Sequence, residues 1–184
     1  MFKRLTKNEG SRGSAAEVWI NKEQRLIKKY YKVNGIGCRG NIIIENDQQI
    51  LEHYWKTEIY WTKKFKKFAP ALLDYGIEDK SFFIVQEYYA PDLLKNYVDK
   101  TLWDDYPNIK NDLIEFFEQC KEYNIYKFNH ALSNMTGKNG KVKFFDFKYV
   151  EPRTISNRVS EIKSLHMWIS KIDKDLVTIL EKMI

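Results

Sequence analysis

The stretch "NHALSNMTGKNGKVKFFDF" (129–147) joins two hydrophobic runs through a polar turn. The runs are Ala131–Met135 and Val142–Phe147, and the turn between them reads Gly-Lys-Asn-Gly. Two apolar runs around such a turn are typical of a β-hairpin. Asn134 lies just before the turn, and Asp146 lies within the second run. A carboxylate inside a core strand needs an explanation, and the rest of the chain has to supply it.

The size and composition indicate one globular domain. The chain has 184 residues, of which 43% are hydrophobic and 15% aromatic, and this is enough for a sizeable core. It has no run of about 18 apolar residues, so we expect no membrane span. The N-terminus lacks the apolar stretch of a signal peptide. Cys38 and Cys120 have no metal-binding spacing and fit reduced thiols in a cytoplasmic protein.

The chain is basic, with a formal net charge of +6. Its densest lysine run is "TKKFKKF" (62–68). One interpretation is a solvated helix face. The other is attraction to a polyanion, such as nucleic acid or the phosphates of a nucleotide. The charge alone does not decide between them.

The hydrophobic patterns predict an α+β fold. Short alternating runs predict strands at 17–20 and 25–31, and a second pair around a turn at 77–80 that ends with a strand at 82–88. Apolar spacing of three and four predicts helices at about 46–68, 108–123 and 173–183, and one after Pro152 lined by Ile155, Val159, Ile162 and Ile169. Strands therefore dominate the first half, and helices dominate the second half around the quoted hairpin.

Three further polar features stand beside the hairpin. The loop "EGSRGSAAEVW" (9–19) contains Gly10 and Gly13, whose backbone can approach an anion closely; a plain surface loop is the alternative. Alternation puts Lys28 and Lys29 on opposite faces of one strand, so one of them points along the buried side unless the strand is an edge strand from which both amines reach solvent. We assign Lys28 to the buried side, and the choice between the two lysines stays open.

Glu58 is the third feature, because it interrupts the apolar stripe of the helix at 46–68. A buried carboxylate is costly unless it is paired, and a lysine of the preceding strand is the obvious partner; a salt bridge at the helix edge is the alternative. Asn134 and Asp146 then offer one amide oxygen and one carboxylate. Such a pair suits Mg²⁺, which completes its shell with phosphate oxygens and water.

This order of features resembles the protein-kinase-like fold, including its smaller aminoglycoside-phosphotransferase-type relatives. The resemblance runs from about Asn8 to Phe147. It implies one domain over 1–184, with a small β-rich N-lobe at about 1–88, a hinge at about 86–93 and a shortened helical C-lobe at about 94–184. The small size is similar to that of compact kinase-like proteins of phages, viruses and bacterial effectors, which implies the host cytoplasm if the source is viral.

The resemblance also implies a site for ATP with Mg²⁺ or Mn²⁺ between the lobes. In the family a strand lysine pairs with a helix glutamate and holds the α/β-phosphates, and the hinge backbone meets adenine. The implied nucleotide-binding residues are Gly10, Gly13, Lys28, Glu58, Glu87 and Tyr89. Asn134 and Asp146, in "DFK", match the metal-binding asparagine and the DFG aspartate.

The sequence departs from the family pattern in its catalytic loop. "KFN" (127–129) stands where the family has H-R-D, so Asn129 replaces the aspartate that accepts the proton of the substrate hydroxyl group. An asparagine can position a hydroxyl group but cannot act as its base, and the adjacent His130 is the alternative base. Lys148 replaces the glycine of DFG, where it would reach a phosphate or point to solvent.

Three functions follow from these features. The first is a minimal kinase-like protein that binds ATP and Mg²⁺ and transfers phosphate to a protein with weak or atypical activity. The second is a pseudokinase that acts as a protein-binding module, because Asn129 replaces the catalytic aspartate. The third is a basic nucleic-acid-binding protein, which leaves Glu58 and Asp146 without an explanation. None of them involves a membrane.

Overall fold

In a computed structural model of the protein, the described residues are 1–5, 16–31, 36–39, 42–45, 48–89, 92–94, 105–127 and 132–184. They form two compact units. Unit 1 comprises Met1–Lys64 and Pro70–Tyr88, and unit 2 comprises Phe65–Ala69 and Tyr89–Ile184. The elements are mixed α and β, which confirms the α+β prediction. The lobe bounds expected from the sequence stay predictions.

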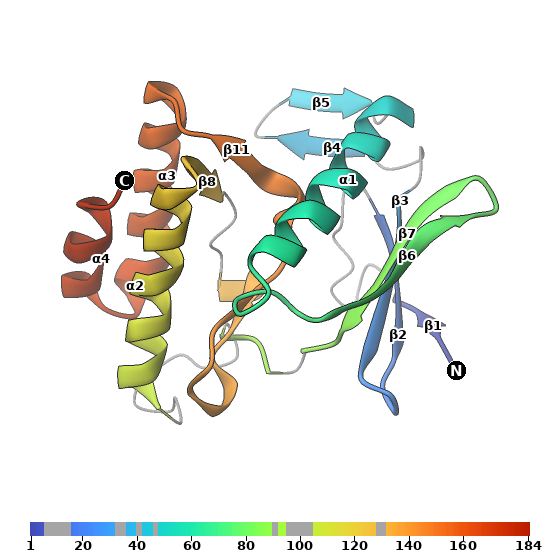
Figure 1. Ribbon diagram of the computed structural model, residues 1–184, viewed down its shortest axis with the longest axis horizontal. Helices are drawn as coiled ribbons and strands as arrows, with labels where there is room; N and C mark the ends of the chain where they lie inside the picture. The colour runs from blue at the N-terminus through green and yellow to red at the C-terminus, as the bar shows by residue number, and fades with distance from the viewer. Residues whose placement is uncertain are drawn as a thin grey trace. The chain divides into compact units, whose positions relative to one another are not determined.

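Unit 1 is built on a five-stranded antiparallel sheet (Figure 1). In order across the sheet, its strands are β1 (Lys3–Arg4), β2 (Ala16–Asn21), β3 (Leu26–Tyr31), β7 (Ser81–Glu87) and β6 (Leu72–Glu78). A separate hairpin pairs β4 (Ile36–Arg39) with β5 (Ile42–Glu45). The β2–β3 and β6–β7 hairpins lie where the alternating runs predict them.

The helix α1 (Gln48–Lys64) covers one face of this sheet, packing on β3, β6 and β7. The core between them contains Leu51 from the helix and Tyr31, Phe82 and Ile84 from the strands. Trp55 stacks on Phe82 at 5.0 Å between ring centroids. Each large apolar side chain buried in this way contributes about 1.5–3 kcal/mol to stability. The packing of α1 therefore determines which face of the sheet, and so which strand residues, are buried.

Among its described residues, unit 2 contains three α-helices, two short antiparallel strand pairs and several 3-10 turns. The helices are α2 (Tyr106–Glu122), α3 (Ile155–Trp168) and α4 (Lys174–Glu181), and α4 packs against both α2 and α3 (Figure 1). Strand β8 (Ile125–Lys127) pairs antiparallel with β11 (Val150–Pro152). The apolar stripe predicted for α2 is confirmed, because its members are all buried: Ile109, Leu113, Phe116, Phe117 and Cys120.

The hairpin that the sequence predicts at 131–147 is only partly formed. Its strands are β9 (Met135–Thr136) and β10 (Lys143–Phe144), each two residues long. Asn134 ends a 3-10 turn ahead of β9. Asp146 comes after β10 in a left-handed conformation, with φ at 59°, so it is wrong to place it on a strand face. The chain turns out of the strand after Phe144 and thereby presents the carboxylate from a bend.

The stripe predicted for α3 is also wrong in part. The helix forms, with Thr154 as its N-cap, but Ile155 and Val159 are 88% and 51% exposed. The buried residues of α3 are Glu161 and Leu165. Its buried face is thus shared by a leucine and a carboxylate. A rule that seeks only apolar residues selects the wrong face for such a helix.

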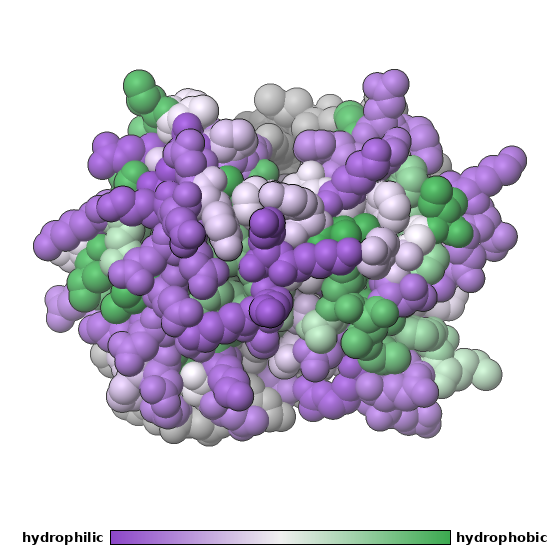
Figure 2. Space-filling model, in the orientation of Figure 1, coloured by the Kyte–Doolittle hydropathy of each residue, from purple (hydrophilic) through white to green (hydrophobic). Residues whose placement is uncertain are grey.

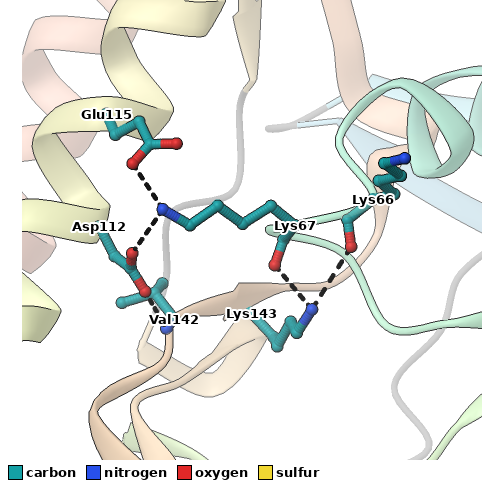
Figure 3. Close-up of polar contacts among 6 residues, drawn as sticks. All are labelled: Lys66, Lys67, Asp112, Glu115, Val142 and Lys143. Atoms are coloured by element: carbon teal, nitrogen blue, oxygen red, sulfur yellow. Dashed lines mark hydrogen bonds and ion pairs between the residues drawn. The ribbon is translucent and has the colours of Figure 1, made fainter.

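The segment Phe65–Ala69 forms polar contacts with the rest of unit 2 (Figure 3). Lys67 forms ion pairs with Asp112 and Glu115 of α2. Lys143 donates to the carbonyl oxygen of Lys67 at 2.6 Å. These contacts engage part of the lysine run at 62–68 within the protein itself. Phe68 and Phe65, from the same segment, are fully buried.

On the face shown in Figure 2, hydrophilic side chains predominate and hydrophobic ones form smaller groups. Exposed large apolar side chains include Leu73, Tyr75 and Ile77 of β6. In the part of the chain that the structure describes, no helix is long and apolar enough to cross a membrane.

Candidate functional site

Unit 1 contains a buried ion pair between the sheet and α1. Lys29 Nζ donates to Glu58 Oε1 at 2.7 Å, and the hydroxyl group of Tyr31 donates to Glu58 Oε2. The glutamate is 1% exposed and the lysine 8%. Both carboxylate oxygens therefore have a donor, which is what a buried carboxylate requires. Glu58 holds the Lys29 ammonium group in a fixed position on the α1 side of the sheet.

The assignment of Lys28 to the buried side is thus wrong. Lys28 lies on the opposite face of β3, where its Nζ is 2.7 Å from Glu78 Oε2 and 4.3 Å from the ring centroid of Phe83. Desolvation there acts to lower the pKa of Lys28, but the hydrogen bonds with Glu78 and Tyr30 outweigh it and raise that pKa. Lys28 and Glu58 form no pair. The predicted pairing of Glu58 with a lysine of the preceding strand is right, and the partner is Lys29.

Register explains which lysine is buried. In an antiparallel sheet, residues directly opposite each other point to the same face. Lys29 is opposite Ile84, which belongs to the core beneath α1, whereas Lys28 is opposite Val85 and Trp19. Which face of β3 is buried depends on the side on which α1 packs. The alternation within β3 shows only that the two lysines lie on opposite faces.

The end of β7 holds the expected hinge residues of unit 1. Glu87 accepts the backbone N–H of Ala71 at 2.9 Å through its carboxylate, and its own backbone N–H donates to the Ala71 carbonyl at 3.1 Å. The backbone N–H of Tyr88 donates to the carbonyl of Arg25 at 2.9 Å. Two backbone donors in this stretch are therefore already used within the sheet. Contact of this backbone with adenine stays a prediction, as does the role of Tyr89 in unit 2.

In unit 2 Asp146 lies beside Lys148. Lys148 Nζ is 3.0 Å from Asp146 Oδ1, across the turn Phe147–Tyr149. The lysine side chain is 5% exposed and the aspartate side chain 25% exposed. A left-handed conformation at a residue other than glycine costs about 1 kcal/mol or more, and such residues occur both in turns and at functional sites. Asp146 thus combines backbone strain with a carboxylate that solvent reaches.

A second buried lysine, Lys127, lies in the same region. It is fully buried, with Nζ 5.1 Å from the ring centroid of Phe147. Desolvation lowers the pKa of Lys127 to about 8, against the opposing attraction of Asp146 and Glu161. Burial also raises the pKa of Glu161 well above its usual range, and Lys127 and Arg153 oppose this. The turn around Asp146 is therefore backed by buried titratable side chains.

The sequence interpretation missed Lys127 and Glu161. Lys127 is the last residue of "IYK" (125–127), in which all three residues are buried. Glu161 lies outside the apolar stripe that the sequence predicts for α3, and it is buried. A buried lysine at the end of a strand has the same local pattern as an exposed one, so the sequence carries no signal for it. Only the packing of α3 beside β8 shows it.

The side-chain types of Asp146 and Asn134 suit a magnesium ion that has other ligands as well. The backbone carbonyl of Asn134 accepts the N–H of Phe145 at 2.8 Å, which brings Asn134 next to the turn that carries Asp146. One carboxylate and one amide oxygen are the ligand types that Mg²⁺ takes from a protein when phosphates and water supply the rest. Among the described residues, no cluster of three or more His, Cys, Asp or Glu side chains forms a site for a metal held by protein ligands alone.

Four predicted site residues lie outside the described residues. They are Gly10 and Gly13 of the small-residue loop and Asn129 and His130 of the presumed catalytic loop. Their expected roles in phosphate binding and catalysis stay predictions.

Comparison with known proteins gives a fold-level relationship. No protein-family model and no curated protein matches the chain. Solved structures do match. A medium-resolution structure of the bifunctional kinase-methyltransferase WbdD aligns with 100% of this chain and 46% of its own, at 13% identity and a TM-score of 0.64. A 2.2 Å crystal structure of WbdD aligns with 92% of this chain and 43% of its own, at 14% identity and a TM-score of 0.60.

A crystal structure of monomeric WbdD gives the same result, with 98% and 48% of the two chains, 15% identity and a TM-score of 0.58. The fold is kinase-like. This chain spans less than half of those solved chains, and at such low identity the likeness shows the fold alone. In this chain Lys29 on β3 pairs with Glu58 on α1.

Proposed function

We propose that the protein is a minimal kinase-like phosphotransferase that uses ATP with Mg²⁺ or Mn²⁺ and acts on a protein with weak or atypical activity. The observation that carries the proposal is the Lys29–Glu58 pair on a kinase-like fold. In this proposal Glu58 orients the Lys29 ammonium group, and Lys29 binds the α/β-phosphates. A lysine tied to a buried carboxylate keeps one position, so little conformational entropy is lost when it meets a phosphate.

Asp146 and Asn134 would hold the metal ion. The ion supplies neutralisation of the charge on the transferred phosphate, which is the largest requirement of such a reaction. The protein would supply the carboxylate of Asp146, a residue in the left-handed conformation, and the side-chain amide oxygen of Asn134. Gly10 and Gly13 would approach the phosphates through their backbone N–H groups, and the backbone from Glu87 to Tyr89 would contact adenine.

Asn129 limits the catalytic part of the proposal. It cannot accept a proton, so transfer would depend on positioning and charge neutralisation, with His130 as the alternative base. A protein that binds the nucleotide but transfers nothing is the second candidate, a pseudokinase that engages a protein partner. The nucleic-acid function is weakened, because Lys67 of the 62–68 run is engaged by Asp112 and Glu115.

A nucleotide titration with neighbouring lysines as a matched pair tests the binding step. Wild type, Lys29→Met and Lys28→Met would be titrated with ATP and Mg²⁺ by calorimetry, after circular dichroism has shown that each variant is folded. We expect wild type and Lys28→Met to bind alike and Lys29→Met to lose at least about tenfold in affinity. At a free ATP concentration of 100 times the dissociation constant, binding stabilises the fold by about 2.7 kcal/mol, so the melting temperature must rise.

The binding proposal fails if wild type does not bind ATP, or if Lys28→Met loses binding and Lys29→Met keeps it. Transfer is tested separately with γ-labelled ATP, using wild type and Asn129→Asp. We expect Asn129→Asp to transfer faster, because an aspartate restores the missing base. Intact ATP binding without labelled product in either protein would favour the pseudokinase.

A further inference from the structure

We propose that Lys148 is the counter-ion of Asp146 as long as no metal is bound. When a divalent cation binds, the Lys148 ammonium group leaves this carboxylate and passes to a phosphate oxygen of the bound nucleotide. Metal and nucleotide would then bind cooperatively, and the metal alone only weakly. The proposal rests on the function proposed above, and it assigns to Lys148 the control of metal binding at that site.

The first observation is the contact itself. Lys148 Nζ lies 3.0 Å from Asp146 Oδ1. A metal cation that binds to this oxygen would therefore compete with the ammonium group. The lysine side chain is 5% exposed, so it is largely removed from the water that would otherwise solvate its charge. A buried ammonium group needs an anionic partner. Asp146 supplies one.

The second observation is the charge around the contact. Lys127 is fully buried and close enough to Asp146 and Lys148 for both to influence its charge. Two lysines therefore already act on one carboxylate that is 25% exposed. A divalent cation added there meets the charge of Lys148 at short range and is also repelled by that of Lys127. Because Lys127 is enclosed beneath Phe147 and Phe144, Lys148 is the group that has to move.

The third step concerns where Lys148 goes. It sits two residues after Asp146 on a turn of three residues, so its reach includes the ligands of any metal bound to Asp146. A nucleotide brings phosphate oxygens to that metal, and these can replace the carboxylate as the partner of the ammonium group. The metal and the phosphate then each lower the cost of binding the other. Such coupling is reciprocal, so it is measurable from either ligand.

A purely structural role of Lys148 predicts a different result. If Lys148 only fills its site and neutralises Asp146, its removal changes the stability of the fold but leaves the coupling between metal and nucleotide as it is. The coupling, and not the stability or the activity, is therefore the quantity to measure.

The experiment measures Mn²⁺ binding by electron paramagnetic resonance, with and without a non-hydrolysable ATP analogue. Wild type is compared with Lys148→Met and with Lys141→Met, an exposed lysine of unit 2 that serves as the matched control. We expect Lys148→Met to bind Mn²⁺ alone at least about tenfold more tightly than wild type and to show weaker coupling with the nucleotide. Lys141→Met should behave as wild type.

Asp146→Asn and the double variant Asp146→Asn/Lys148→Met separate the two proposals. If wild type binds Mn²⁺ with the nucleotide and Asp146→Asn does not, the metal site stands. An unchanged Mn²⁺ affinity and coupling in Lys148→Met then overturns the counter-ion alone. If Asp146→Asn proves unfolded, the double variant, which leaves no unpaired lysine at this position, makes the same test. Absence of Mn²⁺ and nucleotide binding in wild type and Lys148→Met overturns both proposals.

Discussion

The two units each contain a buried lysine beside a carboxylate, but the two pairs differ in how closed they are. In unit 1 Glu58 is 1% exposed, and each of its carboxylate oxygens accepts from a different residue, Lys29 or Tyr31. In unit 2 the lysine is the buried partner, whereas the side chain of Asp146 is 25% exposed and sits on a left-handed bend.

This difference separates two uses of the same chemistry. A carboxylate that accepts from two donors and is closed to solvent holds a lysine in place and offers no open side to a further ligand. A carboxylate at the surface of a turn, with its lysine behind it, keeps a side toward solvent where a ligand can arrive. The pair in unit 1 is therefore suited to orient a cationic side chain, and the pair in unit 2 is suited to exchange its cation.

The largest expected effect is that of Glu58→Ala. It leaves the Lys29 ammonium group and the Tyr31 hydroxyl group without their partner in a buried site, which costs about 3–5 kcal/mol in the free energy of unfolding. Urea denaturation measures the loss. The control is Glu52→Ala on the same helix, whose exposed pair with Lys56 is worth about 0.3–0.5 kcal/mol. Equal losses for both variants would show that the unit 1 pair is not enclosed.

The next effect is that of Asp146→Ala, which leaves Lys148 buried without this partner. Because the aspartate is partly exposed, we expect a smaller loss, about 2–3 kcal/mol in the free energy of unfolding. Lys148→Met in the same chain should recover much of it, since the methionine needs no counter-charge. A double variant that is no more stable than Asp146→Ala would contradict the pairing. The Asp146→Ala loss also means that its melting temperature falls whether or not it binds metal.

A smaller effect concerns Glu161 and depends on pH. Burial raises the pKa of Glu161 in the folded protein, so its stabilising contribution is complete below the ordinary value of 4.5 and is lost as the pH rises through the raised value. Glu161→Gln cannot lose a proton. The difference in unfolding free energy between this variant and wild type should therefore grow in favour of the variant from pH 4.5 upward. A difference that is independent of pH would show that Glu161 does not titrate there.

The smallest effect is that of Lys28→Met, which removes an ion pair with the half-exposed Glu78 and should cost no more than about 1 kcal/mol in the free energy of unfolding. Lys29→Met, one residue further along β3, should change the stability more, because it removes a buried partner of Glu58. Paired urea denaturation curves make the comparison. A larger loss for Lys28→Met would reverse the assignment of the two faces of β3.

The sequence predicted the elements better than their faces. The β2–β3 and β6–β7 hairpins and the helices α1 to α4 occur where the patterns indicate them, because period-2 and period-3.6 spacing are local properties. Asp146 was expected on a strand, and Ile155 and Val159 on a buried stripe. The end of a strand and the buried face of a helix depend on the groups that pack against them. In α3 the buried face includes Glu161.

Two properties could be read from the sequence: Glu58 needs a cationic partner if it is buried, and Lys28 and Lys29 point to opposite faces. Both follow from local chemistry, namely the desolvation of a carboxylate and the pleat of a strand. That Lys29 is the partner depends on tertiary packing, because α1 packs on the sheet face that Ile84 and Lys29 share. The tertiary structure also decided that Lys148 turns back onto Asp146 and that Lys127 is buried behind them, since these contacts depend on the packing around the turn.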